Sequence, residues 1–212
     1  RQVGEDGGCE SDRFLFLLSF SLSFPQNPGK IDSLKNLLAT AHEDTARVNI
    51  LNCLANELKR NNPDTAIYYA EQALAISERI NYETGIASAH LGMGIAIMNL
   101  GNYDEALKHL VETRKICEQL LSSENGAKNT IATKNYKQIL ARSIYTIGTI
   151  QYSKGNFQDA LDFFLQALKI REAIGDKHGL SDSYISLGAI YWNRGNYPDA
   201  LRNCYDALKI ID

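Results

Sequence analysis

Apolar and polar positions follow the same order in four segments of the chain, and each segment contains an alanine at its sixth position. Three of the segments match closely and a fourth is weaker; they span residues 101–107, 155–161, 195–201 and 61–67. The shared alanines are separated by 40, 54 and 40 residues, and they are Ala66, Ala106, Ala160 and Ala200. Internal similarity at a regular period is the signature of a protein built from stacked structural repeats.

The residues around each segment predict two helices joined by a tight turn. A small residue stands seven positions before the turn in three copies, as Gly94, Gly148 and Gly188, whereas Leu54 takes this place in the first copy. The residues seven positions after the shared alanines are also short, and they are Ala73, Thr113, Ala167 and Ala207. Small side chains at both places let two backbones approach closely. We therefore predict helix, turn and helix in every unit.

The turn carries signals that stop one helix and start the next. Gly101, Gly155 and Gly195 can adopt the left-handed conformation that ends a helix. An asparagine, a favoured N-cap, follows each of them. An acidic residue three positions further on gives an arrangement like a capping box. In the first copy Asn62 is the predicted cap and Pro63 takes the first helical position, where proline is preferred.

This pattern resembles the tetratricopeptide repeat (TPR), and the resemblance covers about residues 47–212. The last copy matches best, through Leu187, Gly188, Tyr191, Gly195, Tyr197, Ala200 and Ala207. The standard repeat has about 34 residues, whereas the period here is mostly 40 and the closing proline is missing. The resemblance implies an all-α fold, a right-handed superhelical solenoid of antiparallel helix pairs with about four repeats. We expect these to start near residues 47, 87, 141 and 181, with an insertion at about 121–140.

The N-terminal part divides into three segments. Residues 1–12 remain an unassigned leader. Residues 13–24 are almost all apolar, too short for a membrane-spanning helix, and similar to the apolar region of a secretory signal. The alternative is an extra strand or helix packed on the array. Residues 25–46 are predicted to be a linker and an N-terminal capping helix. The protein is expected to be exported, periplasmic or membrane-associated if 13–24 is a signal, and otherwise cytoplasmic.

Two phrases in the first repeat, residues 44–51 and 63–74, suggest a closer relationship. They look like the N-terminal TPR sensor arrays of bacterial membrane signalling proteins, whose outputs are histidine kinases, nucleotide cyclases or LuxR-like modules. Chaperone-binding TPRs grip a C-terminal carboxylate with a basic clamp, and only Arg142 matches a clamp position here. The asparagines that mark adaptors with Leu-Gly-Asn repeats are absent from the matching positions. Neither of those two partner modes is supported.

Composition and motifs argue against catalysis. The formal net charge of −3, without a basic block, gives no reason to expect a nucleic-acid partner. Four separated cysteines, read as buried free thiols, form no disulfide or zinc pattern; they are Cys9, Cys53, Cys117 and Cys204. The sequence around Gly92 and Gly94 is mid-helix and is no dinucleotide loop. We find no catalytic, cofactor-binding or metal-binding set and expect neither an enzyme nor a small-molecule substrate.

The remaining hypothesis is a module that binds a protein or peptide segment in a concave groove, as the sensory or scaffolding region of a larger bacterial signalling protein. The alternative is a structural spacer or a self-association module without a dedicated ligand. The first helix of each pair is predicted to line the groove. Its early wall is expected to be apolar, with Val48, Leu51, Ala55, Leu58 and Lys59.

The later wall is expected to hold the partner. Tyr, Trp and Arg are the residue types enriched at binding hot spots. The predicted partner-binding residues are Arg142, Tyr145, Tyr152, Trp192 and Asn193. The alternative is that Tyr152 and Trp192 only fill the interface between repeats. The last helix is predicted to expose Leu201, Leu208 and Ile211, and thereby to support self-association through the C-terminal edge. The abrupt ending also suggests that the natural protein continues.

Overall fold

A computed structural model describes residues 28–123 and 130–211, which are almost entirely helical. Nine helices and no strand occur in these residues. The helices are α2 (Pro28–Thr40), α3 (Thr45–Leu58), α4 (Pro63–Arg79), α5 (Glu83–Asn99), α6 (Tyr103–Ser122), α8 (Thr130–Ser153), α9 (Phe157–Ile174), α10 (Lys177–Asn193) and α11 (Tyr197–Ile211).

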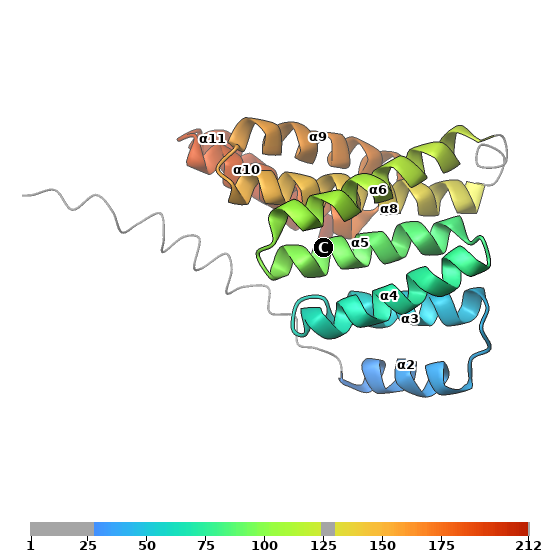
Figure 1. The fold of residues 1–212 in the computed structure, drawn as a ribbon. Coiled ribbons are helices and arrows are strands. Elements are labelled where there is room, and N and C mark those ends of the chain that lie inside the picture. Colours follow the sequence, from blue (N-terminus) through green and yellow to red (C-terminus); the bar gives the residue numbers. More distant parts are fainter. Residues whose placement is uncertain (1–27, 124–129, 212) are drawn as a thin grey trace, which may run out of the picture.

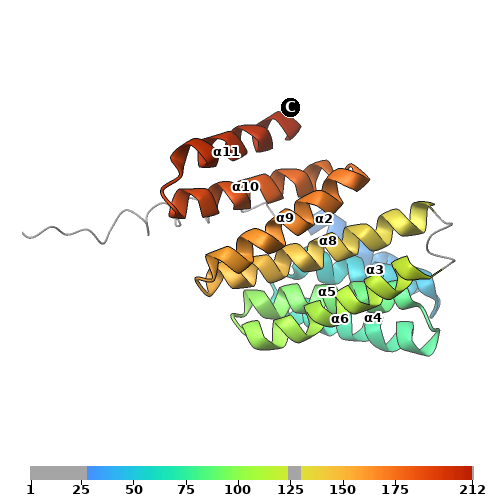
Figure 2. The ribbon, with the colours of Figure 1, turned by 90° about the horizontal axis from the view of Figure 1, so that it is seen from above.

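The helices form antiparallel pairs that stack into a solenoid (Figure 1). The pairs are α3 with α4, α5 with α6, α8 with α9 and α10 with α11. Helix α2 packs against α3 at one end of the stack, and Figure 2 shows α11 at the opposite edge. The first helices also contact one another between pairs, α3 with α5 and α5 with α8, so that they form one wall of the array. The predicted all-α solenoid is therefore confirmed.

Small residues lie where the paired helices cross, as predicted. The four shared alanines and the four short residues that follow them are all buried. A Cβ atom added to Gly148 would lie 2.8 Å from a ring carbon of Phe164, and one added to Gly94 would lie 2.8 Å from the side chain of Leu110. Any larger residue at these glycines would force the helices apart, because the second helix already fills the space.

The turns follow the predicted chemistry with one exception. Gly101, Gly155 and Gly195 have φ angles of +83°, +81° and +73°, which an L-amino acid with a side chain adopts at a cost. Asn62 caps α4 with its side chain, directly before Pro63. Asn156 instead makes no capping hydrogen bond, and its amide nitrogen donates to Gln151 Oε1 at 2.8 Å. The nearby glutamine therefore competes with the helix end for this side chain.

The N-terminal helix α2 closes one end of the core. Ile31 is buried, and Leu34 and Leu38 pack against the same hydrophobic cluster as Leu54 and Leu58 of α3. The signal-like segment 13–24 lies outside the described residues. Within the described part of the chain, no helix has the length and apolar character needed to cross a membrane.

The cysteines are only partly as expected. Cys117 is buried, and burial raises the pKa of its thiol to about 12. Cys53 and Cys204 are exposed, so that the prediction of buried thiols is wrong for these two. Cys53 lies on a face of α3 that is turned away from the core, and Cys9 lies outside the described residues.

Candidate functional site

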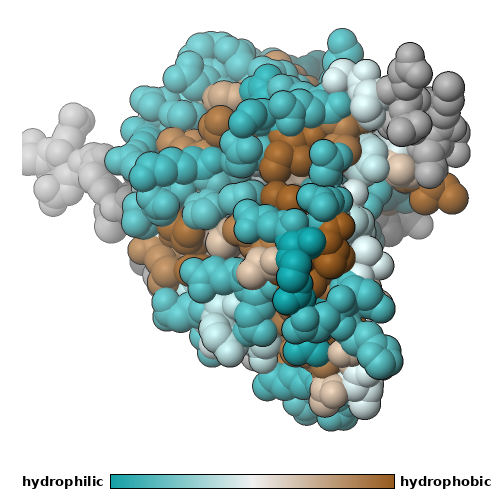
Figure 3. Space-filling view, turned by 45° about the vertical axis from the view of Figure 1, so that its right-hand side comes forward, coloured by the Kyte–Doolittle hydropathy of each residue, from teal (hydrophilic) through white to brown (hydrophobic). Residues whose placement is uncertain are grey.

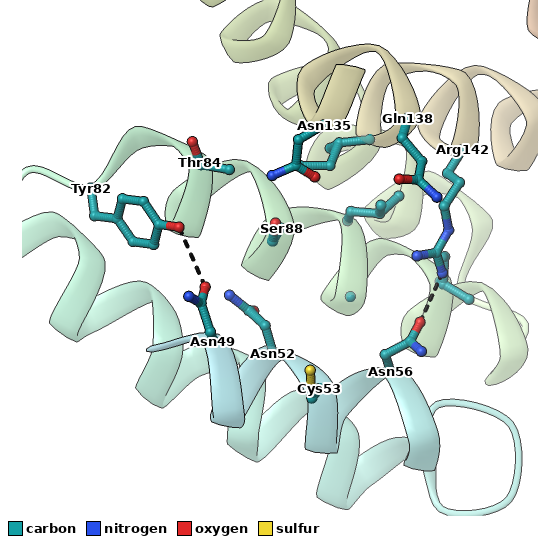
Figure 4. A pocket seen from close by; sticks show the side chains of 14 residues that line it. Asn49, Asn52, Cys53, Asn56, Tyr82, Thr84, Ser88, Asn135, Gln138 and Arg142 are labelled. Carbon is teal, nitrogen blue, oxygen red and sulfur yellow. Dashed lines mark hydrogen bonds between the residues drawn. The ribbon is translucent and has the colours of Figure 1, made fainter. Parts of the chain in front are cut away.

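The concave wall contains an open pocket of about 450 Å³ between α3, α5 and α8. Figure 4 shows polar side chains from all three helices converging on it. Hydrophobic contacts come from Leu91, Ile95 and Ile139 on its floor. Its polar lining residues are Asn49, Asn52, Asn56, Tyr82, Thr84, Ser88, Asn135, Gln138 and Arg142. The predominance of amide side chains is its main chemical feature.

The predicted wall on α3 is wrong for its four apolar residues, whereas Lys59 does line the groove, in the second pocket described below. Val48 and Leu51 are fully buried against α4 and α5, and Ala55 and Leu58 are buried in the neighbouring cluster. The asparagines of α3 that line the pocket each follow one of the predicted residues in the sequence. The predicted face of α3 is therefore rotated by about 100° from the observed one. Asparagines at positions 49, 52 and 56 share one helix face. That spacing was the signal in the sequence that could have identified the polar wall.

Several polar atoms in this pocket have weak partners or none. The hydroxyl of Tyr82 donates to Asn49 Oδ1 at 3.4 Å, and Asn52 Nδ2 donates to the carbonyl of Gly85 at 3.4 Å. The Oδ1 atom of Asn52 is buried and has no hydrogen-bond donor within the described residues. A buried acceptor without a donor is unfavourable by about 1–3 kcal/mol. The fold therefore satisfies the polar groups of this wall only weakly.

A second pocket, of about 270 Å³, adjoins the first and is lined by cations. Lys59, Arg60, Arg142 and Arg171 line it, with Asp182 as the only carboxylate among its lining residues. Arg142 and Ile95 also line the first pocket, so that the two pockets adjoin at these side chains. The second pocket thus places four basic groups beside the amide-rich wall.

One amide oxygen holds two of these cations. Arg142 Nη2 donates to Asn56 Oδ1 at 2.8 Å, and Lys59 Nζ donates to the same oxygen at 2.5 Å. Burial lowers the pKa of Lys59 to about 7, with further lowering from Arg142 and Arg60. Burial likewise raises the pKa of Asp182, against the opposing effect of Arg171. The local environment therefore disfavours the charged forms of both Lys59 and Asp182.

The C-terminal part of the wall is aromatic, and its polar groups are paired. The hydroxyls of Tyr145 and Ser186 lie 2.8 Å apart, and the Tyr145 ring lies between Phe164 and the guanidinium of Arg171, whose carbon is 4.4 Å from the ring centroid. Arg171 is buried, and its Nη1 donates to Gly179 O and Ser183 Oγ, both at 2.7 Å. Tyr145 also lines a small third pocket of about 90 Å³.

The structure brings together three of the five predicted binding residues. Arg142, Tyr145 and Tyr152 line the three pockets. Trp192 and Asn193 line none of the three. Asn193 Nδ2 instead donates to the Tyr152 hydroxyl at 2.6 Å, and the Trp192 ring, 42% exposed, packs on Tyr197 with ring centroids 4.9 Å apart.

A histidine pair joins α5 to α6 away from these pockets. The Nδ1 atoms of His90 and His109 are 2.9 Å apart, so one ring must donate and the other accept. Burial lowers the pKa of both, and the charge of His109 lowers that of His90 further. No sequence pattern predicted this pairing. No group of three or more metal-ligating side chains gathers within the described residues.

Hydrophilic side chains cover most of the face in Figure 3, with hydrophobic side chains in patches between them. On α11, by contrast, Leu201, Tyr205 and Leu208 are exposed by 73%, 58% and 61%. The exposure predicted for Leu201 and Leu208 is confirmed. The side chain of Ile211, which was predicted to join them, lies outside the described part of the chain.

Two family models match the sequence. The model described as the SusR N-terminal TPR domain matches residues 25–128, and a tetratricopeptide repeat model matches residues 136–211. Together the two matches cover most of the described residues. No curated protein matches the chain in sequence.

Solved structures share the architecture. BtubC from P. vanneervenii is similar with a TM-score of 0.63 and 20% identity, over 87% of this chain and 74% of that one. A Rap protein complexed with competence and sporulation factor is similar with a TM-score of 0.71 and 20% identity, over 85% of this chain and 47% of that one. A signal transduction ATPase from Pyrococcus horikoshii with a tetratricopeptide repeat sensor has a TM-score of 0.60 and 21% identity, over 85% of this chain and 26% of that one. The chain spans less than half of the last two proteins, and such identities indicate a common fold.

Proposed function

Because the chain belongs to the tetratricopeptide repeat proteins, we propose that its concave groove binds an extended segment of a partner protein. Proteins of this kind act in general through protein–protein interaction. The observation that carries the proposal is the amide-rich pocket between α3, α5 and α8. Its volume of about 450 Å³ lies within the usual range of ligand sites.

Amide side chains suit this task because each can both donate and accept a hydrogen bond. The peptide main chain presents the same two groups at every residue, whatever its side chains are. The side chains of Asn52 on α3 and of Asn135 and Gln138 on α8 lie on opposite sides of this pocket (Figure 4). A segment lying between α3 and α8 could therefore replace water at both walls.

We further propose that the segment continues towards the C-terminal repeats. Arg142 and Tyr145 would contact its middle, while Tyr152, Trp192 and Asn193 would form the far rim of the groove. Replacement of Tyr145 or Trp192 by Ala is expected to weaken binding by roughly 2 kcal/mol. Trp192 is the only tryptophan, so that its fluorescence reports on this rim directly. Full affinity in both folded variants would remove these two residues from the site.

The test begins with selection of binders from a display library of short random peptides. A selected peptide should lose about tenfold in affinity, or about 1.4 kcal/mol, when Asn52 is replaced by Leu or Gln138 by Ala. Gln119→Ala on the exposed side of α6 is the matched control and should have no effect. Isothermal titration calorimetry gives the affinities. If the pocket variants bind as well as the control, or no peptide is selected, the proposal fails.

We also infer that the array is the sensory or scaffolding region of a larger bacterial signalling protein. The match to a model described as an N-terminal TPR domain supports this, since such a domain precedes other parts of its protein. The resemblance of residues 44–51 and 63–74 to sensor arrays points in the same direction. The complete reading frame around this sequence decides the question: an output domain is expected, and its absence would favour a structural spacer.

Self-association is a second candidate function, supported by the exposed apolar face of α11. Leu201, Tyr205 and Leu208 are exposed on this helix at the edge of the stack. A contiguous apolar surface of this kind favours association. We expect light scattering to show dimers at high concentration and Leu201→Glu with Leu208→Glu to abolish them. A strictly monomeric protein at all concentrations would contradict this candidate.

A further inference from the structure

We infer that the middle of the groove binds the carboxylate of an internal Asp or Glu side chain of the partner segment. This inference rests on the proposed peptide-binding function and specifies the chemistry of the peptide. The site is the junction between the amide-rich pocket and the cationic pocket, where Lys59 and Arg142 meet on Asn56.

The charges at this junction do not balance. Four basic residues line the cationic pocket and Asp182 is the one carboxylate among its lining residues, in a protein whose formal net charge is −3. Glu57 and Asp176 act on these cations from outside the lining. Within the described residues, no ion pair joins Lys59 or Arg142 to a carboxylate. Elsewhere, Lys30 is paired with Glu57 at 2.8 Å and Lys154 with Asp104 at 2.8 Å. A local excess of positive charge in an acidic protein is complementary to an anionic partner.

The existing partner of the two cations is electrically neutral. Lys59 Nζ and Arg142 Nη2 share one amide oxygen, and Figure 4 shows Asn56 and Arg142 directed towards each other across the pocket. A carboxylate offers two charged oxygens, so that it would add ionic attraction to the hydrogen bonds that these two cations already donate.

The continuity of the pockets favours a side chain over a chain terminus as the source of the carboxylate. Arg142 joins the first pocket to the second, and Tyr145 and Thr149 join the second to the third. An extended segment that crosses the cationic pocket would therefore have a further pocket on either side of it. A C-terminal carboxylate held at Arg142 would leave one of the two outer pockets without peptide.

Lys59 makes the interaction sensitive to pH. The charged groups near Lys59 come from four parts of the structure. They are Glu57 and Arg60, which are close to it in the sequence, Arg142 of α8, Arg171 of α9 and Asp182 of α10. With a pKa of about 7, Lys59 loses its proton above neutrality in the free protein. A bound carboxylate would raise that pKa, so that binding takes up a proton. Affinity must then fall as the pH rises above about 7, by up to tenfold per unit.

The probe is a capped peptide of alternating Glu and Ser, compared with its Gln–Ser counterpart. At about pH 6 we expect the Glu peptide to bind at least tenfold more tightly. Arg142→Gln and Lys59→Gln should each remove most of this preference. At about pH 8, where Lys59 is largely unprotonated in the free protein, calorimetry in buffers of different ionisation enthalpy should show proton uptake on binding, and Lys59→Gln should remove it. Lys115→Gln, an exposed lysine on α6, is the charge-matched control and should change neither.

Several results would overturn the inference. One is equal affinity for the Glu and Gln peptides, and another is an equal loss in the Lys115→Gln control. A Gln–Ser peptide with a free C-terminal carboxylate should not recover the affinity, and its recovery would identify a chain terminus as the ligand. Tighter binding of inorganic phosphate or of an oligonucleotide would indicate another anion. If peptides from the display library still require Asn52 while the Glu preference is absent, the proposed function stands and this inference alone fails.

Discussion

Two arginines of the inner wall, Arg142 in α8 and Arg171 in α9, have different roles. Arg142 belongs to the N-terminal half of the groove, between α3, α5 and α8. Arg171 belongs to the C-terminal half, where α8 and α9 meet α10. Arg171 is 2% exposed, donates twice to neighbouring oxygens and lies over the Tyr145 ring. Arg142 is half-buried and donates to a single neutral amide that it shares with Lys59. Arg171 therefore fixes the contact between two repeats, whereas Arg142 retains donors for another molecule.

Polar side chains therefore have different roles in the two halves of the groove. In the C-terminal half, hydroxyl and amide groups pair with each other, as Tyr145 does with Ser186 and Tyr152 with Asn193. In the N-terminal half, amides and cations outnumber the partners that the fold supplies. Substitutions in the C-terminal half should therefore change stability first, and those in the N-terminal half should change binding first.

The largest expected effect tests the two arginines directly. Arg171→Ala should lower the free energy of unfolding by about 3 kcal/mol, because it leaves a cavity and removes both hydrogen bonds to Gly179 and Ser183. Arg142→Ala should lower it by less than about 1 kcal/mol while weakening binding of acidic peptides. Urea denaturation provides the comparison. Equal losses in the two variants would show that the distinction between the halves is wrong.

The next effect comes from supplying the missing carboxylate within the protein. Asn56→Asp places an anion at the oxygen position that Lys59 and Arg142 already share. We expect the variant to be more stable by about 1 kcal/mol and to bind the Glu–Ser peptide about tenfold more weakly, because the cations are then occupied. Unfolding and titration calorimetry measure both changes. An unchanged affinity would contradict the assignment of the junction.

A smaller effect is the pH dependence of stability that Lys59 introduces. Its pKa is about 7 in the folded protein and about 10.5 when unfolded, so that the unfolded chain binds more protons between these values. The unfavourable contribution of Lys59 is complete below about pH 7 and is relieved as the pH rises towards 10.5. After allowance for solvent screening, we expect a gain of about 1 kcal/mol that Lys59→Met lacks. Parallel curves for both proteins would exclude this contribution.

The smallest effect concerns the exposed pair in the C-terminal half. Tyr152→Phe removes the hydrogen bond from Asn193 and leaves the ring contact with Phe157. We expect a loss of less than about 0.5 kcal/mol, because water replaces the lost partner. Peptide affinity should change only slightly, and the size of this change should not depend on the salt concentration. A large loss of affinity would make the Tyr152 hydroxyl a binding group in its own right.

The features that the sequence predicted well are local ones. The left-handed turn at Gly195 depends on residues within one turn of it, and the close crossing at Gly148 depends on one facing side chain, Phe164. The wall of α3 was predicted one residue out of register, because its orientation depends on where α4, α5 and α2 take up apolar side chains. The three asparagines of this helix carried the information, but only the packing of Val48 and Leu51 decides which face is exposed.

The candidate site was predictable only in part for the same reason. Arg142, Tyr145 and Tyr152 follow from the geometry of one helix, and all three line the groove. The approach of Lys59 to Arg142 joins residues 83 positions apart, in the first and third repeats, and depends on the curvature of the whole array. A repeat pattern gives the order of the helices but not the residues that meet across two repeats.

The central claim, that the N-terminal half of the groove holds the partner segment, is tested most directly by side-chain nuclear magnetic resonance. Resonances of the Asn and Gln amides and of the arginine Nε groups are followed while a library-selected peptide is added. We predict shifts for Asn52, Asn56, Gln138 and Arg142, with Gln119 on the outer side unchanged. Shifts confined to Asn203 and its neighbours on α11, with the groove amides unchanged, would contradict the account.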